Sequence, residues 1–166
     1  MRTNTQKIVT ASLLAALCCV ATIIIKIPSP LKGYVNLGDC IVLLSGWLLT
    51  PAYGFLAAGI GSALADVLSG YVIYAPATMI IKGAMAIIAH FFFKVMYKRA
   101  GKTSARIAGG IIAEIAMISG YFVFEGFLHG FMPSVVNIPA NALQGAFGII
   151  MGMILVKVFE KSKIFF

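Results

Sequence analysis

The sequence predicts an all-α integral membrane protein with six transmembrane helices and both termini in the cytoplasm. Of its 166 residues, 61% are hydrophobic and only 11% are charged, and the mean hydropathy is +1.01. Soluble domains carry about 25% charged residues, so this much apolar surface has to be solvated by lipid. At roughly 20 residues per span, about six helices fit with short connections. We therefore expect one membrane domain over 1–166 and no separate soluble catalytic domain.

Six apolar runs supply the helices. In chain order they cover 8–27, 37–49, 53–68, 76–96, 107–128 and 138–159. The first run could be read as a signal peptide, but it is longer than a typical signal core, so we expect it to be retained. The second and third are short, and Pro51 at their junction favours a tight antiparallel hairpin over one long span with a buried proline. The other prolines also fall at or next to the ends of runs, which supports the number of six predicted helices.

The basic residues set the orientation. Among the 13 Lys and Arg, all but Lys26, Lys32 and Lys82 flank the start of the first run, the connection between the fourth and fifth, or the end of the last. An even number of spans puts these connections on one side, which the positive-inside rule assigns to the cytoplasm. The formal net charge of +8 thus reports orientation, and we expect contact with a lipid bilayer and none with nucleic acid.

Polar side chains inside the runs indicate a pocket that opens outward. An ionisable group in a span needs a partner or a water-filled cavity. With the orientation above, Asp39, Asp66, Lys82 and Glu125 fall in the outer half of the membrane, and Glu114 lies about three turns deeper than Glu125. Asp66 and Lys82 lie at similar depth, so they form either a buried structural ion pair or contacts to substrate.

Two polar stripes follow from helical spacing. On the fifth run Glu114, Tyr121, Glu125 and His129 share a face, and on the sixth run Asn137, Asn141 and Gln144 do. Both stripes are richest near the outside, which favours a hydrated binding pocket between these helices. Hydrogen bonding that only holds the bundle together is the alternative.

The connection over 28–37 is expected to cover this pocket. It is longer than two adjacent helices need, and its prolines, Gly33, Tyr34 and Asn36 are typical of a defined, movable loop rather than a strand or helix. Tyr34 offers a ring to stack on a heterocycle, and Asn36 offers an amide. A passive connector is the alternative.

Several features of the sequence exclude other sites. Gly101, Lys102 and Thr103 look like the end of a phosphate-binding loop, but Met96 occupies the required earlier glycine position and no strand precedes it. There is no nucleophile elbow, and the three cysteines have no ligand spacing. We expect no catalytic residue, no metal and no cofactor. Ala11 and Ala15 form a small-residue stripe that would let another helix approach closely.

The ordered motifs resemble a known family, the substrate-binding S component of energy-coupling factor (ECF) vitamin transporters. The motifs that carry the resemblance are Gly33-Tyr-Val-Asn-Leu-Gly-Asp39, Pro51-x-Tyr-Gly54, Gly59-Ile-Gly-Ser-Ala-Leu-Ala-Asp66, Tyr74-Ala-Pro-Ala-Thr-Met-Ile-Ile-Lys-Gly83 and Pro139-Ala-Asn-x-Leu-Gln144-Gly145. The resemblance is strongest to the riboflavin, pyridoxine and hydroxymethylpyrimidine branch. It implies a multi-pass protein of the bacterial cytoplasmic membrane, an outward vitamin pocket roofed by the loop after the first helix, and partnership with an ECF transmembrane coupling subunit and two ATPase subunits.

The resemblance and the polar pattern together define the expected sites. The coupling subunit is expected to dock on Ala11 and Ala15, and the substrate-binding residues are expected to be Tyr34, Asn36, Asp39, Tyr74, Lys82, Tyr121, Glu125, His129, Asn141 and Gln144. The predicted function is capture of a small water-soluble vitamin (vitamin B6, hydroxymethylpyrimidine or a riboflavin-like compound) and its delivery inward with an ATP-driven module.

Two other classes of function compete with this one. A self-sufficient, proton-coupled secondary carrier or channel would use Asp66 or Glu114 as its proton site. An intramembrane enzyme would use Glu125 and His129 as acid and base, because two titratable groups one turn apart can transfer protons.

Overall fold

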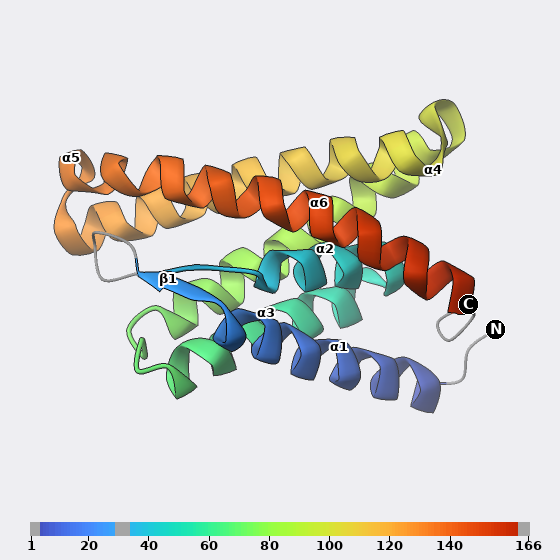
Figure 1. Cartoon of the computed structure of the whole chain (residues 1–166), viewed down its shortest axis with the longest axis horizontal. Coiled ribbons are helices and arrows are strands. Elements are labelled where there is room, and N and C mark those ends of the chain that lie inside the picture. Colours follow the sequence, from blue (N-terminus) through green and yellow to red (C-terminus); the bar gives the residue numbers. More distant parts are fainter. Residues whose placement is uncertain (1–3, 29–33, 163–166) are drawn as a thin grey trace.

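The protein is a bundle of helices that run along one long axis, with a short hairpin at one end (Figure 1). The computed structural model describes residues 4–28 and 34–162. Its elements are α1 (Asn4–Ile24), β1 (Lys26–Pro28), β2 (Tyr34–Asn36), α2 (Gly38–Leu48), α3 (Pro51–Leu68), α4 (Ala75–His129), α5 (Phe131–Ser134), the 3-10 helix η1 (Val135–Asn137) and α6 (Ile138–Ser162). The prediction of a helical membrane fold is confirmed in outline.

Four helical segments of the described residues are long and apolar enough to cross a membrane. They begin at Asn4, Pro51, Ala75 and Phe131, and α2 is a shorter apolar helix. The 55-residue α4 is two helices joined at Gly101, whose φ of 75° and ψ of 168° are not helical. Glycine adopts a positive φ without steric cost, so the chain can reverse there. The two arms of α4 contain the runs predicted at 76–96 and 107–128.

Helix α2 lies at the centre of the bundle. It packs against α1, α3, α4 and α6, and every residue from Gly38 to Trp47 is buried. A helix surrounded on all sides has no face toward solvent, which explains why this run is apolar apart from Asp39 and Ser45. A Cβ on Gly46 would lie 2.5 Å from the Ala86 carbonyl oxygen, so α2 and α4 are in backbone contact there. The first turn of α2 therefore carries Asp39 into the interior.

The connection predicted to be a loop contains a β-hairpin instead. Strands β1 and β2 pair antiparallel, with Lys26 opposite Asn36 and Ile27 opposite Val35. Because the strand begins at Lys26, α1 ends at Ile24, three residues before the predicted end of the first run. Pro30 and Gly33, on which part of the prediction rested, lie outside the described residues. Pairing satisfies backbone groups that a plain loop at the end of the bundle would leave open.

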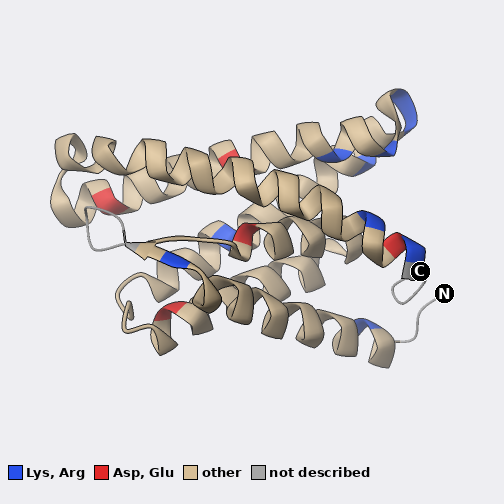
Figure 2. Cartoon of the chain, viewed as in Figure 1, with Lys and Arg blue, Asp and Glu red and all other residues tan. Residues whose placement is uncertain are grey.

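Charge is distributed unequally along the bundle axis (Figure 2). Lys and Arg gather at the end that holds the start of α1, the Gly101 turn and the end of α6. Glu160 pairs with Lys102 and Arg106, whereas Asp66 and Glu125 line the same cavity as Tyr34 of the hairpin. Arg106 at the basic end donates from Nη2 to Glu160 Oε1 at 2.9 Å and faces the rings of Trp47 and Phe93.

Candidate ligand cavity

A buried ion pair lies inside the bundle, near the end that carries the hairpin. Lys82 on α4 donates to Oδ1 of Asp39, and the two residues are only 2% and 0% exposed. Gln144 on α6 donates from Nε2 to the other oxygen, Oδ2, at 2.7 Å. Both carboxylate oxygens of Asp39 thus have partners. The sequence left open whether Asp66 and Lys82 form an ion pair or contact substrate; in the described residues Lys82 pairs with Asp39, which the central α2 presents to it.

Gln144 also holds the hairpin. Its Oε1 accepts a hydrogen bond from the Asn36 backbone N–H at 2.9 Å, while Asn36 Oδ1 accepts from the Gly38 N–H at 2.8 Å. The amide of Asn36 was predicted to face a ligand, but its oxygen closes the turn from β2 into α2. One side chain of α6 therefore connects the hairpin to the buried ion pair.

Glu114 lies beside this pair without a hydrogen-bond partner in the described part of the chain. Its side chain is 4% exposed, and neither carboxylate oxygen is bonded there. It packs on the glycine stripe of α6: a Cβ on Gly145 would lie 2.9 Å from Glu114 Oε2, and one on Gly148 would lie 2.8 Å from Asp39 Cβ. These glycines admit two carboxyl side chains into the interface of α2, α4 and α6.

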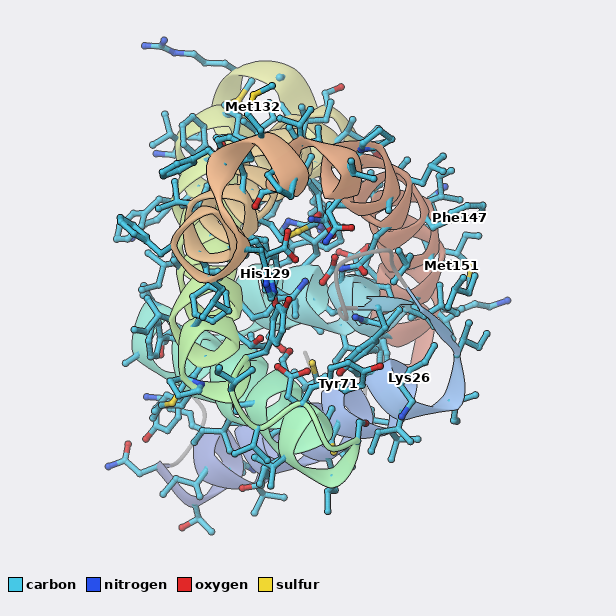
Figure 3. The ribbon with its side chains drawn as sticks, turned by 90° about the vertical axis from the view of Figure 1, so that its left-hand side faces the viewer. Lys26, Tyr71, His129, Met132, Phe147 and Met151 are labelled. Atoms are coloured by element: carbon cyan, nitrogen blue, oxygen red, sulfur yellow. The ribbon has the colours of Figure 1, made fainter. Side chains whose placement is uncertain are left out.

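A cavity with an opening lies at the hairpin end of the bundle, next to Gln144 and the ion pair. It is lined by Tyr34, Asn36, Asp66, Tyr71, Tyr74, Thr78, Tyr121, Glu125, Asn141 and Gln144. Figure 3 looks onto this end of the bundle, with Tyr71 toward its centre and Phe147 and Met151 at its outer edge. Polar groups that converge on one concave site from several helices are typical of a small-molecule site.

Tyr34 connects the hairpin to one wall of the cavity. Its hydroxyl donates to Asp66 Oδ1 at 2.5 Å, and its ring lies 4.8 Å from that of Tyr71. Burial, and then the hydrogen bond to Asp66, raise the pKa of the Tyr34 phenol well above its usual range, so the group remains a donor. Lys26 on β1 lies at the outside of this contact, bonded to Ser69 Oγ at 2.8 Å.

The opposite wall comes from α4 and its junction with α6. Glu125 Oε1 accepts from Asn137 Nδ2 at 2.8 Å, and Tyr74 also interacts with this carboxylate. Deeper on the same helix, the Tyr121 hydroxyl donates to Thr78 Oγ1 at 3.1 Å. The face predicted from helical spacing on the fifth run thus turns inward at Tyr121 and Glu125.

Seven of the ten predicted binding residues line this one cavity. They are Tyr34, Asn36, Tyr74, Tyr121, Glu125, Asn141 and Gln144. Asp39 and Lys82 lie below it as the ion pair, and His129 is exposed at the end of α4, outside the lining. Sequence reasoning missed Tyr71 and Thr78, which carry no charge, and left Asp66 undecided. The feature of the sequence that could have identified Asp66 as a lining residue is its position near the end of an apolar run.

The predicted docking stripe lies on the far side of the bundle. Ala11 and Ala15 line an apolar groove between α1 and α3, together with exposed neighbours such as Ser12 and Ala16. Ala11 is buried and Ala15 is half-buried, and a Cβ on Gly61 would lie 2.4 Å from the Ala15 carbonyl oxygen. The stripe therefore already serves the packing of α1 on α3, and only its outer edge is open.

Comparisons with known proteins identify the family of this chain and a solved structure with the same fold. Residues 2–161 match the sequence model of the family described as ECF-type riboflavin transporter, S component. The chain is 37% identical over 136 residues to an uncharacterized protein in the gap 3' region of Pyrococcus woesei. These aligned residues make up 80% of this chain and 87% of that protein. A solved structure of the S component of a bacterial ECF transporter shares the fold, with a TM-score of 0.77 and 23% identity over 98% of this chain and 99% of that one. Because the family match spans nearly the whole sequence, this protein belongs to the ECF-type riboflavin transporter S component family, a family of transporter components rather than of enzymes.

Proposed function

We propose that this chain is the membrane subunit of an ATP-driven ECF importer that captures a small water-soluble vitamin outside and delivers it inward. The observation that carries the proposal is the convergence of polar side chains from the hairpin, α3, α4 and α6 on one cavity. The ligand class is that of the family branch: vitamin B6, hydroxymethylpyrimidine or a riboflavin-like compound. The protein acts in the cell membrane.

The proposed orientation rests on the distribution of charge. If α2 and both arms of α4 each cross the membrane, the chain has six spans, and the start of α1, the Gly101 turn and the end of α6 share one side. That side carries most of the Lys and Arg, so it faces the cytoplasm. The cavity then opens outward, where the vitamin is captured.

The proposed partners are an ECF transmembrane coupling subunit and two ATPase subunits. The groove between α1 and α3 is the candidate docking surface, because it is apolar and lined by small residues that allow close helix packing. Ala15 and Ala16 at its edge would contact the coupling subunit, whereas Ala11 supports the groove from within.

Transport with and without partners tests this function. The purified chain in proteoliposomes should bind labelled vitamin from outside, yet accumulate it only when the coupling subunit, both ATPases and internal ATP are present. Uptake by the chain alone would contradict the proposal. The matched control is the same vesicle with a non-hydrolysable ATP analogue, which should bind vitamin and not accumulate it.

A proton-coupled secondary carrier is the second candidate function, and Glu114 is the observation that favours it. A buried carboxyl group without a hydrogen-bond partner in the described residues is typical of a proton site in a membrane carrier. This function predicts uptake by the chain alone that a proton uncoupler abolishes and that Glu114→Gln removes. ATP-dependent uptake that survives the uncoupler would exclude it.

A further inference from the structure

The charged groups of the cavity are all acidic. Asp66 and Glu125 line it, only 5% and 3% exposed, and no Lys, Arg or His is among the lining residues of the described chain. The nearest ammonium inside the bundle, on Lys82, is paired with Asp39. The interior around the cavity therefore carries more carboxyl groups than cations in the part that the structure describes.

The cations at the rim do not reverse this balance. Lys26 donates to Ser69 and lies 5.7 Å from the centre of the Tyr34 ring, on the outer side of the hairpin contact. His129 is exposed at the end of α4. Glu114 adds a further buried carboxyl group below the floor.

Two carboxylate oxygens of the cavity lining, Asp66 Oδ2 and Glu125 Oε2, are buried without a hydrogen-bond partner in the described residues. Asp66 Oδ1 accepts the Tyr34 hydroxyl, but Oδ2 is buried and has no hydrogen-bond partner in the described residues. A buried carboxylate without compensation is costly, whereas an opposite charge beside it restores the lost solvation. Lys82 acts electrostatically on Asp66 but is paired with Asp39, and no lining residue of the described chain is a cation, so a ligand is the natural source of a direct counter-charge.

The aromatic lining favours the same kind of ligand. Four tyrosines surround the cavity, with ring centres 4.8 Å apart for Tyr34 and Tyr71 and 6.4 Å apart for Tyr71 and Tyr74. The faces of such rings are electron-rich and attract cations, and their flat surfaces stack on heterocycles. The remaining lining groups, such as Asn141, can both donate and accept hydrogen bonds.

We infer that the ligand of this cavity is a cationic, ring-bearing molecule whose positive group pairs with Asp66 Oδ2 and faces Glu125, while its ring stacks among the tyrosines. The inference rests on the proposed function and narrows its substrate class: a protonated amine or charged heterocycle binds in preference to a neutral flavin or an alcohol.

A matched pair of probes tests this preference. Pyridoxamine carries an ammonium group where pyridoxine carries a hydroxyl, and riboflavin serves as the neutral flavin. Their dissociation constants are measured by isothermal titration on the purified full chain in detergent. Pyridoxamine should bind at least tenfold more tightly than either of the others. Asp66→Asn and Glu125→Gln should each reduce this preference to less than threefold.

Control variants separate loss of charge from loss of fold. Asp66→Glu keeps the charge and should retain most of the preference, and Glu160→Gln removes a carboxylate at the far end of the bundle and should retain all of it. Thermal unfolding identifies any variant that does not fold; if Asp66→Asn does not fold, Glu125→Gln carries the test. Equal or tighter binding of pyridoxine or riboflavin overturns the inference but leaves vitamin capture standing. Failure of all three probes to bind also overturns the inference. The proposed function is then tested separately, by measuring uptake in the presence of the coupling module.

Discussion

Removal of Lys82 should destabilise the protein far more than removal of an exposed lysine. In Lys82→Met the aliphatic part of the side chain is kept, but the Asp39 carboxylate loses its counter-charge. Both residues are almost completely inaccessible, and no other cation is paired with Asp39 in the described residues. Breaking such a buried pair from one side costs about 3–5 kcal/mol, because one charge stays buried and unpaired.

Removing both charges should restore much of this loss. In Asp39→Asn/Lys82→Met the new amide oxygen can still accept the hydrogen bond from Gln144 Nε2, so one buried partner is kept. The remaining cost is that of a neutral hydrogen bond, about 1 kcal/mol. The double variant should therefore be about 2–4 kcal/mol more stable than Lys82→Met, which is the difference between these two costs.

Reversible unfolding in mixed detergent micelles measures these free energies. Lys102→Met is the matched control, because Lys102 pairs with Glu160 at 3.6 Å while its side chain is 57% exposed, and such a pair contributes less than about 1 kcal/mol. The reasoning is refuted if Lys82→Met costs no more than this control. It is refuted as well if the double variant is no more stable than the single one.

Four other predictions follow from the site and the two ends of the bundle. Asn141→Ala should weaken ligand binding by more than about 1 kcal/mol in a titration, and an unchanged affinity would take α6 out of the site. Tyr34→Ala should raise the dissociation rate in stopped-flow experiments far more than it changes association, and an off-rate within twofold of the unmodified protein would contradict this. Ala15→Trp should block coupled transport but not binding, while Leu13→Trp, outside the groove, should permit both. The hydrogen bond from Arg106 on α4 lowers the pKa of Glu160. The free energy that this carboxylate contributes to folding is therefore present above about pH 4.3 and is lost as the pH falls through the lowered pKa. The difference in unfolding free energy between the unmodified protein and Glu160→Gln should shrink on acidification.

The helices and the inward faces could be predicted because they depend on local sequence. Apolar runs bounded by proline and glycine specify the spans, and steps of three and four residues fix which side chains share a face. Tyr121 and Glu125 are therefore found together in the cavity, and so are Asn141 and Gln144. Nothing beyond the period of the helix is needed to predict these pairs.

Contacts between helices could not be predicted in the same way. Asp39, Asp66 and Lys82 lie at similar depth, and depth alone does not say which helix is central. Because α2 lies inside the bundle, Lys82 meets Asp39, and Asp66 is left to Tyr34. The hairpin was missed for a related reason: its strands are only three residues long, too short for an alternating pattern to stand out.

The contacts of Asp66 suggest how capture and closure of the hairpin act together. A cation that binds at Oδ2 leaves Oδ1 to the Tyr34 hydroxyl, so the ligand and the hairpin use different oxygens of one carboxylate. A counter-charge at Oδ2 also keeps the carboxylate ionised, which makes its hydrogen bond from Tyr34 a charge-assisted one. Opening of the hairpin breaks this bond, the one from the Asn36 N–H to Gln144 and the one from Lys26 to Ser69. Ligand binding therefore strengthens the contact that must break before the ligand leaves, and the dissociation rate should depend more steeply on Tyr34 than on any residue at the floor of the cavity.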